Sequence, residues 1–70
     1  MISKNDVKFG RNISKLRKNI GLTQESLAEK AKISTTYIGY IETGQKKPSL
    51  KVINKIASVL KVKVKDLFPY

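Results

Sequence analysis

The sequence has no cysteine, no histidine and only five acidic side chains among its 70 residues. Disulfide bonds and thiolate metal sites are therefore excluded, and the lack of cysteine fits a reducing compartment. The acidic residues form no acid–base or metal-ligand cluster, and the common glycine-rich phosphate loops are missing. We therefore expect no enzymatic activity, no metal, no cofactor and no small-molecule ligand.

Long apolar runs are missing as well. No segment has the roughly 20 consecutive apolar residues that cross a bilayer, and residues 1–6 lack the apolar core of a signal peptide. Seventy residues are enough for one domain with a modest core. We therefore expect a single soluble domain over residues 1–70, located in the cytoplasm.

Positive charge is what the sequence has in excess. Fifteen Lys and Arg residues against five Asp and Glu residues give a net charge of +10. Such a charge attracts polyanions over a long range but says little about fold. Nucleic acid and an anionic membrane surface both fit, as does a lysine-rich surface without a specific partner. A membrane role is disfavoured because no helix segregates a lysine face against large exposed aromatic side chains.

Apolar residues recur at helical spacing along most of the chain. They predict a helix over residues 6–19, which ends before Gly21, a residue suited to the left-handed conformation at a helix C-terminus. Further helices are predicted from the cap Ser49 to about residue 60 and, as a last short element, near residues 64–68. A strand over residues 59–64 is rejected because no second strand exists to pair with it. The apolar stripes consist of Phe9, Ile13, Leu16 and Ile20, and of Leu50, Ile53, Ile56, Ala57 and Leu60.

Two helix starts of the same kind follow each other in the middle of the chain. Thr23 and Ser34 can each accept a hydrogen bond from the free N–H groups of the next turn. An apolar residue before each cap and another in the turn after it form a hydrophobic staple. The staple pairs are Leu22 with Leu27 and Ile33 with Ile38. Because only a few residues separate the two helices, they must cross steeply, which is the geometry of a helix-turn-helix.

From Leu22 to Pro48, with Gly21 and Ser49 on either side, the residues strongly resemble the phage-repressor/Cro-type (XRE-like) helix-turn-helix family. The matching text is GLTQESLAEKAKISTTYIGYIETGQKKPS, and the resemblance extends on both sides over nearly the whole chain. It implies an all-α fold, namely a compact five-helix, lambda-repressor-like domain with the helix-turn-helix at its second and third helices. It also implies that the third helix enters the DNA major groove, and that the protein is bacterial or phage-encoded and nucleoid-associated.

Three lysines depart from the family pattern. Family members often carry Gly where Lys32 and Lys61 stand, so each lysine must either adopt a left-handed conformation or end its helix differently. Lys63 stands where the family has Ser or a similar cap. Since lysine is a poor N-cap, we expect the final helix to fray.

The outward face of the helix after Ser34 is the predicted reading surface. At about 100° per residue, Ile38 and Ile41 point into the core, whereas threonines, a tyrosine and a glycine point outward. Threonine can donate or accept at base edges, and its methyl group can contact that of thymine. No Arg, Asn or Gln projects from this helix, so we expect specificity to depend on thymine methyl groups and DNA shape. The predicted base contacts, the first two of which match principal reading positions of the family, are Thr35, Thr36, Tyr37, Gly39 and Tyr40.

Phosphate contacts are predicted around the same helix. Gln24 matches the family position at which a side-chain amide and a helix N-terminus bind a phosphate together. Lys46 and Lys47 follow the reading helix, although a single lysine is more often solvated than bound. The resemblance also pairs Arg17 with Glu42 in a mainly structural ion pair. The predicted phosphate contacts are Thr23, Gln24, Ser34, Thr43, Lys46, Lys47 and Arg17.

These observations predict sequence-specific binding of double-stranded DNA by a small transcriptional regulator, a repressor acting as a homodimer on a palindromic operator. The predicted dimer interface is the apolar C-terminal edge formed by Leu67, Phe68 and Tyr70, with simple core packing as the alternative. Three other functions stay open. They are the controller of a restriction–modification system, an antitoxin-type autoregulator, and a protein-interaction module without DNA binding.

Overall fold

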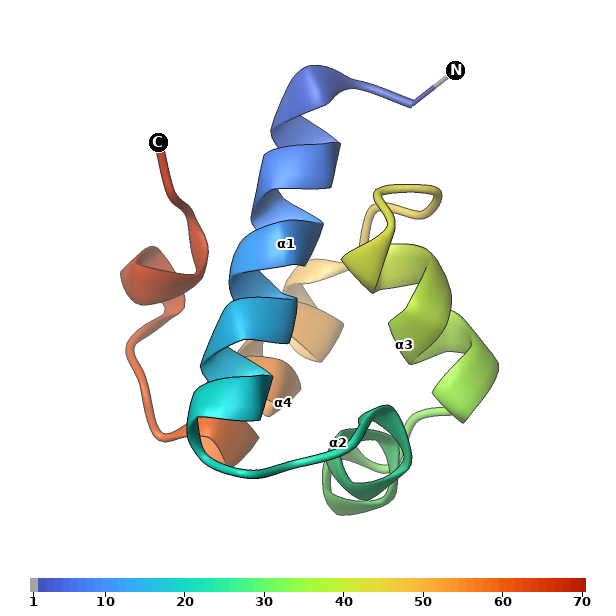
Figure 1. Ribbon diagram of the computed structural model, residues 1–70, viewed down its shortest axis with the longest axis vertical. Coiled ribbons are helices and arrows are strands. Elements are labelled where there is room, and N and C mark those ends of the chain that lie inside the picture. The colour runs from blue at the N-terminus through green and yellow to red at the C-terminus, as the bar shows by residue number, and fades with distance from the viewer. Residues whose placement is uncertain (1) are drawn as a thin grey trace.

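The computed structural model describes residues 2–70, which form four α-helices and one short 3-10 helix (Figure 1). The elements are α1 (Lys4–Asn19), α2 (Gln24–Ala31), α3 (Thr35–Glu42), α4 (Leu50–Leu60) and η1 (Val64–Leu67). No residue from 2 to 70 lies in a β-strand, as the all-α prediction requires. The prediction of five α-helices is wrong, because the last element is a single 3-10 turn.

A hydroxyl group starts each of the four α-helices by accepting a hydrogen bond from a backbone N–H in the first turn. The oxygen–nitrogen distances are 3.0–3.3 Å. The predicted caps Thr23, Ser34 and Ser49 are confirmed. Ser3 caps α1 in the same way, and this moves the start of the helix ahead of the predicted residue Asp6.

Lys32 and Lys61 both take the left-handed conformation, with φ of 57° and 59°. They follow the last residues of α2 and α4, and the structure thus selects the first of the two alternatives that the sequence left open. Each costs about 1 kcal/mol relative to glycine. Gly21 adopts a similar conformation after α1, with φ of 75°, at no steric cost.

The 3-10 turn η1 is held from α1 and by the side chain of its own Asp66, not by the side chain of its N-cap residue. Lys63 precedes η1 and makes no side-chain cap hydrogen bond. The Asn12 side chain of α1 instead donates to the carbonyl oxygens of Asp66 and Leu67, at 2.9 Å each. The Asp66 carboxylate accepts a hydrogen bond from the Lys63 backbone N–H at 3.0 Å.

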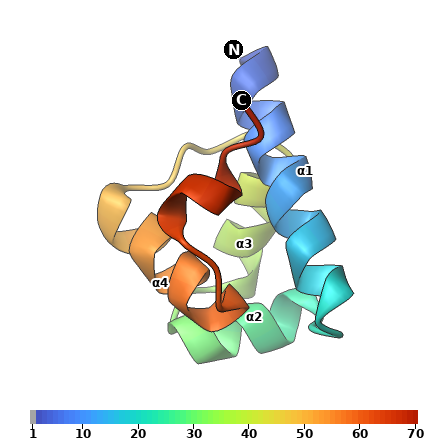
Figure 2. The ribbon, with the colours of Figure 1, turned by 90° about the vertical axis from the view of Figure 1, so that its left-hand side faces the viewer.

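The core lies where α1 crosses the other helices. Helix α1 packs against α3 on one side and against η1 on the other, while α2 packs against both α3 and α4. Figures 1 and 2 show η1 on the side of the molecule away from α3. The buried cluster is Phe9, Ile13, Leu27, Ala28, Ile38, Ile41, Ile56, Ala57, Leu60 and Leu67. None of the helices in residues 2–70 is long and apolar enough to cross a membrane.

Helices α1 and α3 approach closely at Gly10. A Cβ atom added to Gly10 would overlap the carbonyl oxygen of Ile41 and would lie 2.6 Å from that of Glu42. Only glycine therefore allows the backbone of α1 to reach the end of α3. This contact fixes α3 against α1.

The C-terminal edge is partly a core element. Leu67 is 0% exposed, so its assignment to a dimer interface is wrong, and core packing is the correct alternative for this residue. Phe68 is half-buried, with its ring centroid 4.8 Å from that of Phe9. Tyr70 is exposed and packs edge-on against Phe68, at 6.0 Å between centroids. The apolar surface left at this edge comes from Phe68 and Tyr70.

Candidate nucleic-acid interface

Helices α2 and α3 form a tight two-helix unit. The left-handed Lys32 ends α2, and the backbone N–H of Ile33 donates to the carbonyl of Ala28 at 2.9 Å. This pattern ends α2 and turns the chain away from the axis of that helix within a few residues. Ile33 packs against the core, and Ser34 then caps α3. The left-handed Lys32 and the cap at Ser34 thus set the end of α2 and the start of α3.

The two faces of α3 differ sharply. Ile38 and Ile41 are 0% and 1% exposed, as the spacing predicts. On the opposite face Thr35, Thr36 and Tyr40 are exposed. The structure thus presents hydroxyl groups, methyl groups and one aromatic ring on a helix that is fixed from behind.

The other two predicted base contacts are less accessible. Tyr37 is half-buried and packs against the core cluster. Gly39 is half-buried as well. A Cβ atom added there would lie 4.0 Å from the side-chain Oε1 atom of Gln24. Contacts of Tyr37 and Gly39 with DNA stay predictions. Of the two tyrosines on α3, Tyr37 is less exposed to solvent than Tyr40.

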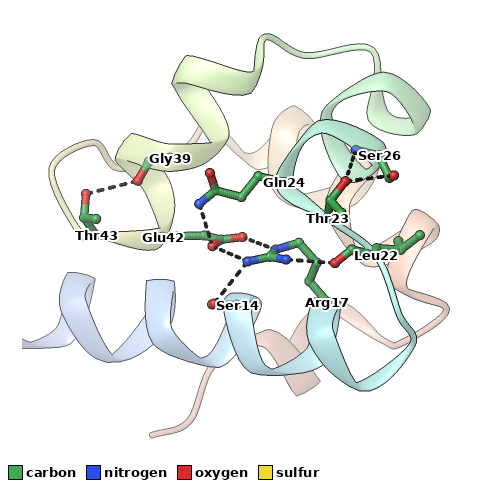
Figure 3. Close-up of polar contacts among 9 residues, drawn as sticks. All are labelled: Ser14, Arg17, Leu22, Thr23, Gln24, Ser26, Gly39, Glu42 and Thr43. Carbon is green, nitrogen blue, oxygen red and sulfur yellow. Dashed lines mark hydrogen bonds and ion pairs between the residues drawn. The ribbon is translucent and has the colours of Figure 1, made fainter.

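Arg17 and Glu42 form a buried ion pair behind α3 (Figure 3). The Arg17 Nε and Nη2 atoms donate to the two Glu42 carboxylate oxygens at 2.7 and 3.0 Å. Nη1 donates to the carbonyl of Leu22 at 2.8 Å, just before α2. Since the two side chains are only 8% and 5% exposed, the pair joins α1, the start of α2 and the end of α3 away from water.

The network sets the charge state of Glu42. Burial alone would raise the pKa of its carboxyl group, but hydrogen bonds from Arg17 and Gln24, with the charge of Arg17, outweigh burial and lower the pKa below its usual value. Glu42 is therefore ionised at neutral pH. A lowered pKa means that the stabilisation is present above the unfolded pKa and is lost as the pH falls through the folded one.

The network also limits two predicted phosphate contacts. Arg17 is 7% exposed and its guanidinium group is bonded to Glu42 and Leu22, which leaves little surface for a phosphate. The Gln24 Nε2 atom donates to Glu42 Oε1 at 3.0 Å. Sequence reasoning missed this bond, because it joins residues on different helices and no local pattern indicates it.

The remaining predicted phosphate contacts precede α2 or lie at and beyond the two ends of α3. Thr23 and Ser34 have their hydroxyl groups engaged in helix caps. The Thr43 hydroxyl donates to the carbonyl of Gly39 at 3.1 Å. Lys46 and Lys47 come next in the chain and are exposed.

The two lysines after α3 have different neighbours. The Lys46 ammonium group lies 5.9 Å from the centre of the Tyr40 ring, which places it beside the outward face of α3. The Lys47 ammonium group lies 4.0 Å from a carboxylate oxygen of Asp6 and is highly exposed. Such an exposed pair contributes little stability, so Lys47 stays available to another anion.

A surface hollow next to Gln24 contains cations that sequence reasoning did not select. Its walls come from α1, the start of α2 and the end of α3. The only sequence signal for it is the spacing of Arg11, Lys15 and Lys18, which puts them on one side of a helix. The lining residues are Arg11, Ser14, Lys15, Lys18, Asn19, Gln24, Glu42 and Thr43.

Two capped helices across a short turn, the second with a polar outward face, define a helix-turn-helix protein. The model of the HTH_3 helix-turn-helix family matches residues 13–67. The chain belongs to this family of helix-turn-helix transcriptional regulators, which confirms the resemblance inferred from the sequence.

Relatives and solved structures agree with this assignment. The chain is 42% identical over 67 residues to an uncharacterized HTH-type transcriptional regulator of Methanocaldococcus jannaschii, covering 96% of this chain and 92% of the relative. The crystal structure of the restriction–modification controller protein C.AhdI from Aeromonas hydrophila matches with a TM-score of 0.93 and 38% identity. That match covers 94% of this chain and 100% of the controller.

A structure containing DNA is also similar. It is that of SinR, described as the master regulator for biofilm formation, in complex with DNA. The TM-score is 0.81 and the identity is 35%, over 84% of this chain and 95% of that chain.

Proposed function

We propose that this transcriptional regulator is a repressor that binds a palindromic DNA operator as a homodimer, with α3 in the major groove. The observation that carries the proposal is the contrast between the faces of α3. Ile38 and Ile41 hold the helix rigidly from behind, while Thr36 and its neighbours are exposed in front. The major groove is wide enough for a helix presented in this way.

Thr35, Thr36 and Tyr40 are the proposed principal base contacts, since they are exposed on the outward face. Gly39 lets the groove approach the helix backbone closely, and Tyr37 contributes the exposed part of its half-buried side chain. Because α3 carries no Arg, Asn or Gln, bidentate recognition of guanine or adenine is missing. Thymine methyl groups and DNA shape are therefore proposed to supply specificity.

The phosphate contacts are proposed to flank α3 on both sides. Gln24 offers its backbone N–H at the start of α2 and the amide hydrogen that Glu42 does not engage. Thr23, Ser34 and Thr43 lie near the backbone but are already used in local hydrogen bonds. Lys46 and Lys47 supply charge beyond the end of α3, and Arg17 is left out because it is buried.

The proposed dimer uses the exposed part of the C-terminal edge, Phe68 and Tyr70. Tyr70 is 60% exposed, and its edge-on contact with Phe68 extends an apolar surface away from the core. Helix-turn-helix dimers bind half-sites about 34–36 Å apart, and this is the separation that we propose for the two α3 helices. Sedimentation at micromolar concentration tests this proposal: a dimer that Tyr70→Ser dissociates supports it, and a strict monomer contradicts it.

Selection of bound sequences from a random pool of duplexes, at a stated salt concentration, tests the function. We expect enrichment of a palindrome whose half-sites are rich in thymine. No enrichment at any salt concentration would contradict the proposal. A protein that also failed to bind duplexes at low salt would instead be an interaction module. The proposal implies a cytoplasmic protein without a catalytic role.

A second candidate function is control of a restriction–modification system. It is favoured by the similarity to the controller C.AhdI, which extends over the full length of that protein. The reading surface would be the same in both cases, so the genes beside the coding sequence distinguish them. Adjacent restriction endonuclease and methyltransferase genes would favour the controller, and their absence would favour a repressor of other genes.

A further inference from the structure

A row of positive charges on α1 is not used by the contacts proposed so far. Arg11, Lys15 and Lys18, here called the α1 basic row, are all exposed. Within residues 2–70, ion pairs form at Arg17 and Lys47, and none involves the basic row. These three cations are therefore free of carboxylate partners in the described part of the chain.

The row faces the same space as two residues of the proposed DNA surface. Arg11, Lys15 and Lys18 line a hollow together with Gln24, which begins α2, and Thr43, which follows α3. Figure 3 shows α1 passing beneath Gln24, Glu42 and Thr43. The positive surface of α1 is thus continuous with the rim of the helix-turn-helix.

Nothing else in the hollow neutralises this charge. Glu42 is its one acidic lining residue, and its carboxylate is already bonded to Arg17 and Gln24. Like charges at the spacings of Arg11, Lys15 and Lys18 destabilise an isolated helix. A polyanion laid across the hollow would reverse that unfavourable effect.

We propose that the α1 basic row binds the phosphodiester backbone of DNA, along the strand that passes Gln24 and Thr43. The inference rests on the proposed function and extends the contacted backbone beyond the helix-turn-helix itself. These contacts read no bases, so they add the same affinity on every duplex. Each phosphate contact adds about 0.9 to the steepness with which log K falls against log salt concentration.

The test compares two charge-matched double variants. Lys15→Gln/Lys18→Gln removes two cations from the hollow, and Lys63→Gln/Lys65→Gln removes two exposed cations at η1, on the side away from α3. Binding of a labelled mixed-sequence duplex is measured by fluorescence anisotropy over a range of salt concentrations. Circular dichroism checks that each variant is folded. We expect both to fold, because the replaced lysines are exposed.

We expect Lys15→Gln/Lys18→Gln to reduce the log–log slope by about two, as the loss of two phosphate contacts requires. The η1 variant should keep a slope close to that of the wild type. Equal slopes for the two variants, with wild-type binding intact, would overturn this inference and leave the proposed function standing. Failure of the wild type to bind the duplex would overturn both.

Discussion

The helix-turn-helix and the C-terminal segment are held in place by different means. Helices α2 and α3 each have a hydroxyl cap, and the buried pair of Arg17 and Glu42 ties them to α1. The segment after α4 begins with the left-handed Lys61 and continues into a 3-10 turn whose N-cap residue makes no side-chain cap hydrogen bond. It is held by Asn12 and by the burial of Leu67.

The difference shows where the protein needs rigidity. A helix that reads DNA, as we propose for α3, must keep its orientation to well within the width of a groove, and several independent contacts fix α3. The C-terminal segment covers one side of the core and offers Tyr70 at its edge. Perturbations of the buried network should therefore cost more stability than equivalent changes in the segment.

Removing the carboxylate of Glu42 should have the largest effect. Glu42→Ala leaves the guanidinium group of Arg17 buried without its counter-ion, which typically costs about 3–5 kcal/mol. Urea unfolding at low temperature measures the loss, and DNA affinity should fall in step with the fraction folded. The control is Asp66→Ala, which removes one exposed hydrogen bond in the C-terminal segment and should cost about 1 kcal/mol or less. Equal losses in the two variants would contradict the contrast between the regions.

The close approach of α1 and α3 should give the next largest effect. Gly10→Ala forces a methyl group onto the carbonyl oxygens at the end of α3, and such overpacking costs about 1–3 kcal/mol. Gly39→Ala is the matched control, because the only neighbour within reach is Gln24 Oε1 at 4.0 Å. It should raise stability by up to about 1 kcal/mol, since alanine favours a helix interior. Thermal unfolding of both variants tests the sign, and a stabilised Gly10→Ala would refute the predicted contact.

The smallest effect is expected where the C-terminal segment leaves α4. Lys61→Gly relieves a left-handed lysine and should stabilise the fold by about 1 kcal/mol. Gly21→Ala is the opposite change, because it puts a side chain on a left-handed residue. The site is sterically open, so the expected loss of about 1 kcal/mol of stability comes from backbone conformation alone. Denaturant midpoints of the two variants should shift in opposite directions. A shift of both in the same direction would rule out backbone strain as the cause.

Features carried by neighbouring residues could be predicted from the sequence. The caps at Thr23, Ser34 and Ser49, the crossing of α2 and α3, and the buried side of α3 all follow from residues a few positions apart. The family resemblance also supplied the partnership of Arg17 with Glu42. Each depends on local spacing or on a matched motif.

Features that depend on contacts across the fold could not be predicted. The sequence left Leu67 open between an exposed apolar edge and the core, and only the folding back of η1 shows that it is buried. The bond from Gln24 to Glu42 joins two helices, and so does that from Asn12 to η1. The α1 basic row reads as an ordinary solvated helix face until α2 and α3 are placed beside it.

The central claim is that the exposed face of α3 reads DNA, and Thr36→Ala tests it most directly. Thr36 is exposed and its replacement removes no buried contact, so the fold should be unchanged. Affinity is measured at one salt concentration on the duplex selected from the random pool and on a mixed-sequence duplex. We predict a loss of about 1–3 kcal/mol on the selected duplex and none on the mixed one. Equal losses on both duplexes, or no loss on either, would contradict the claim.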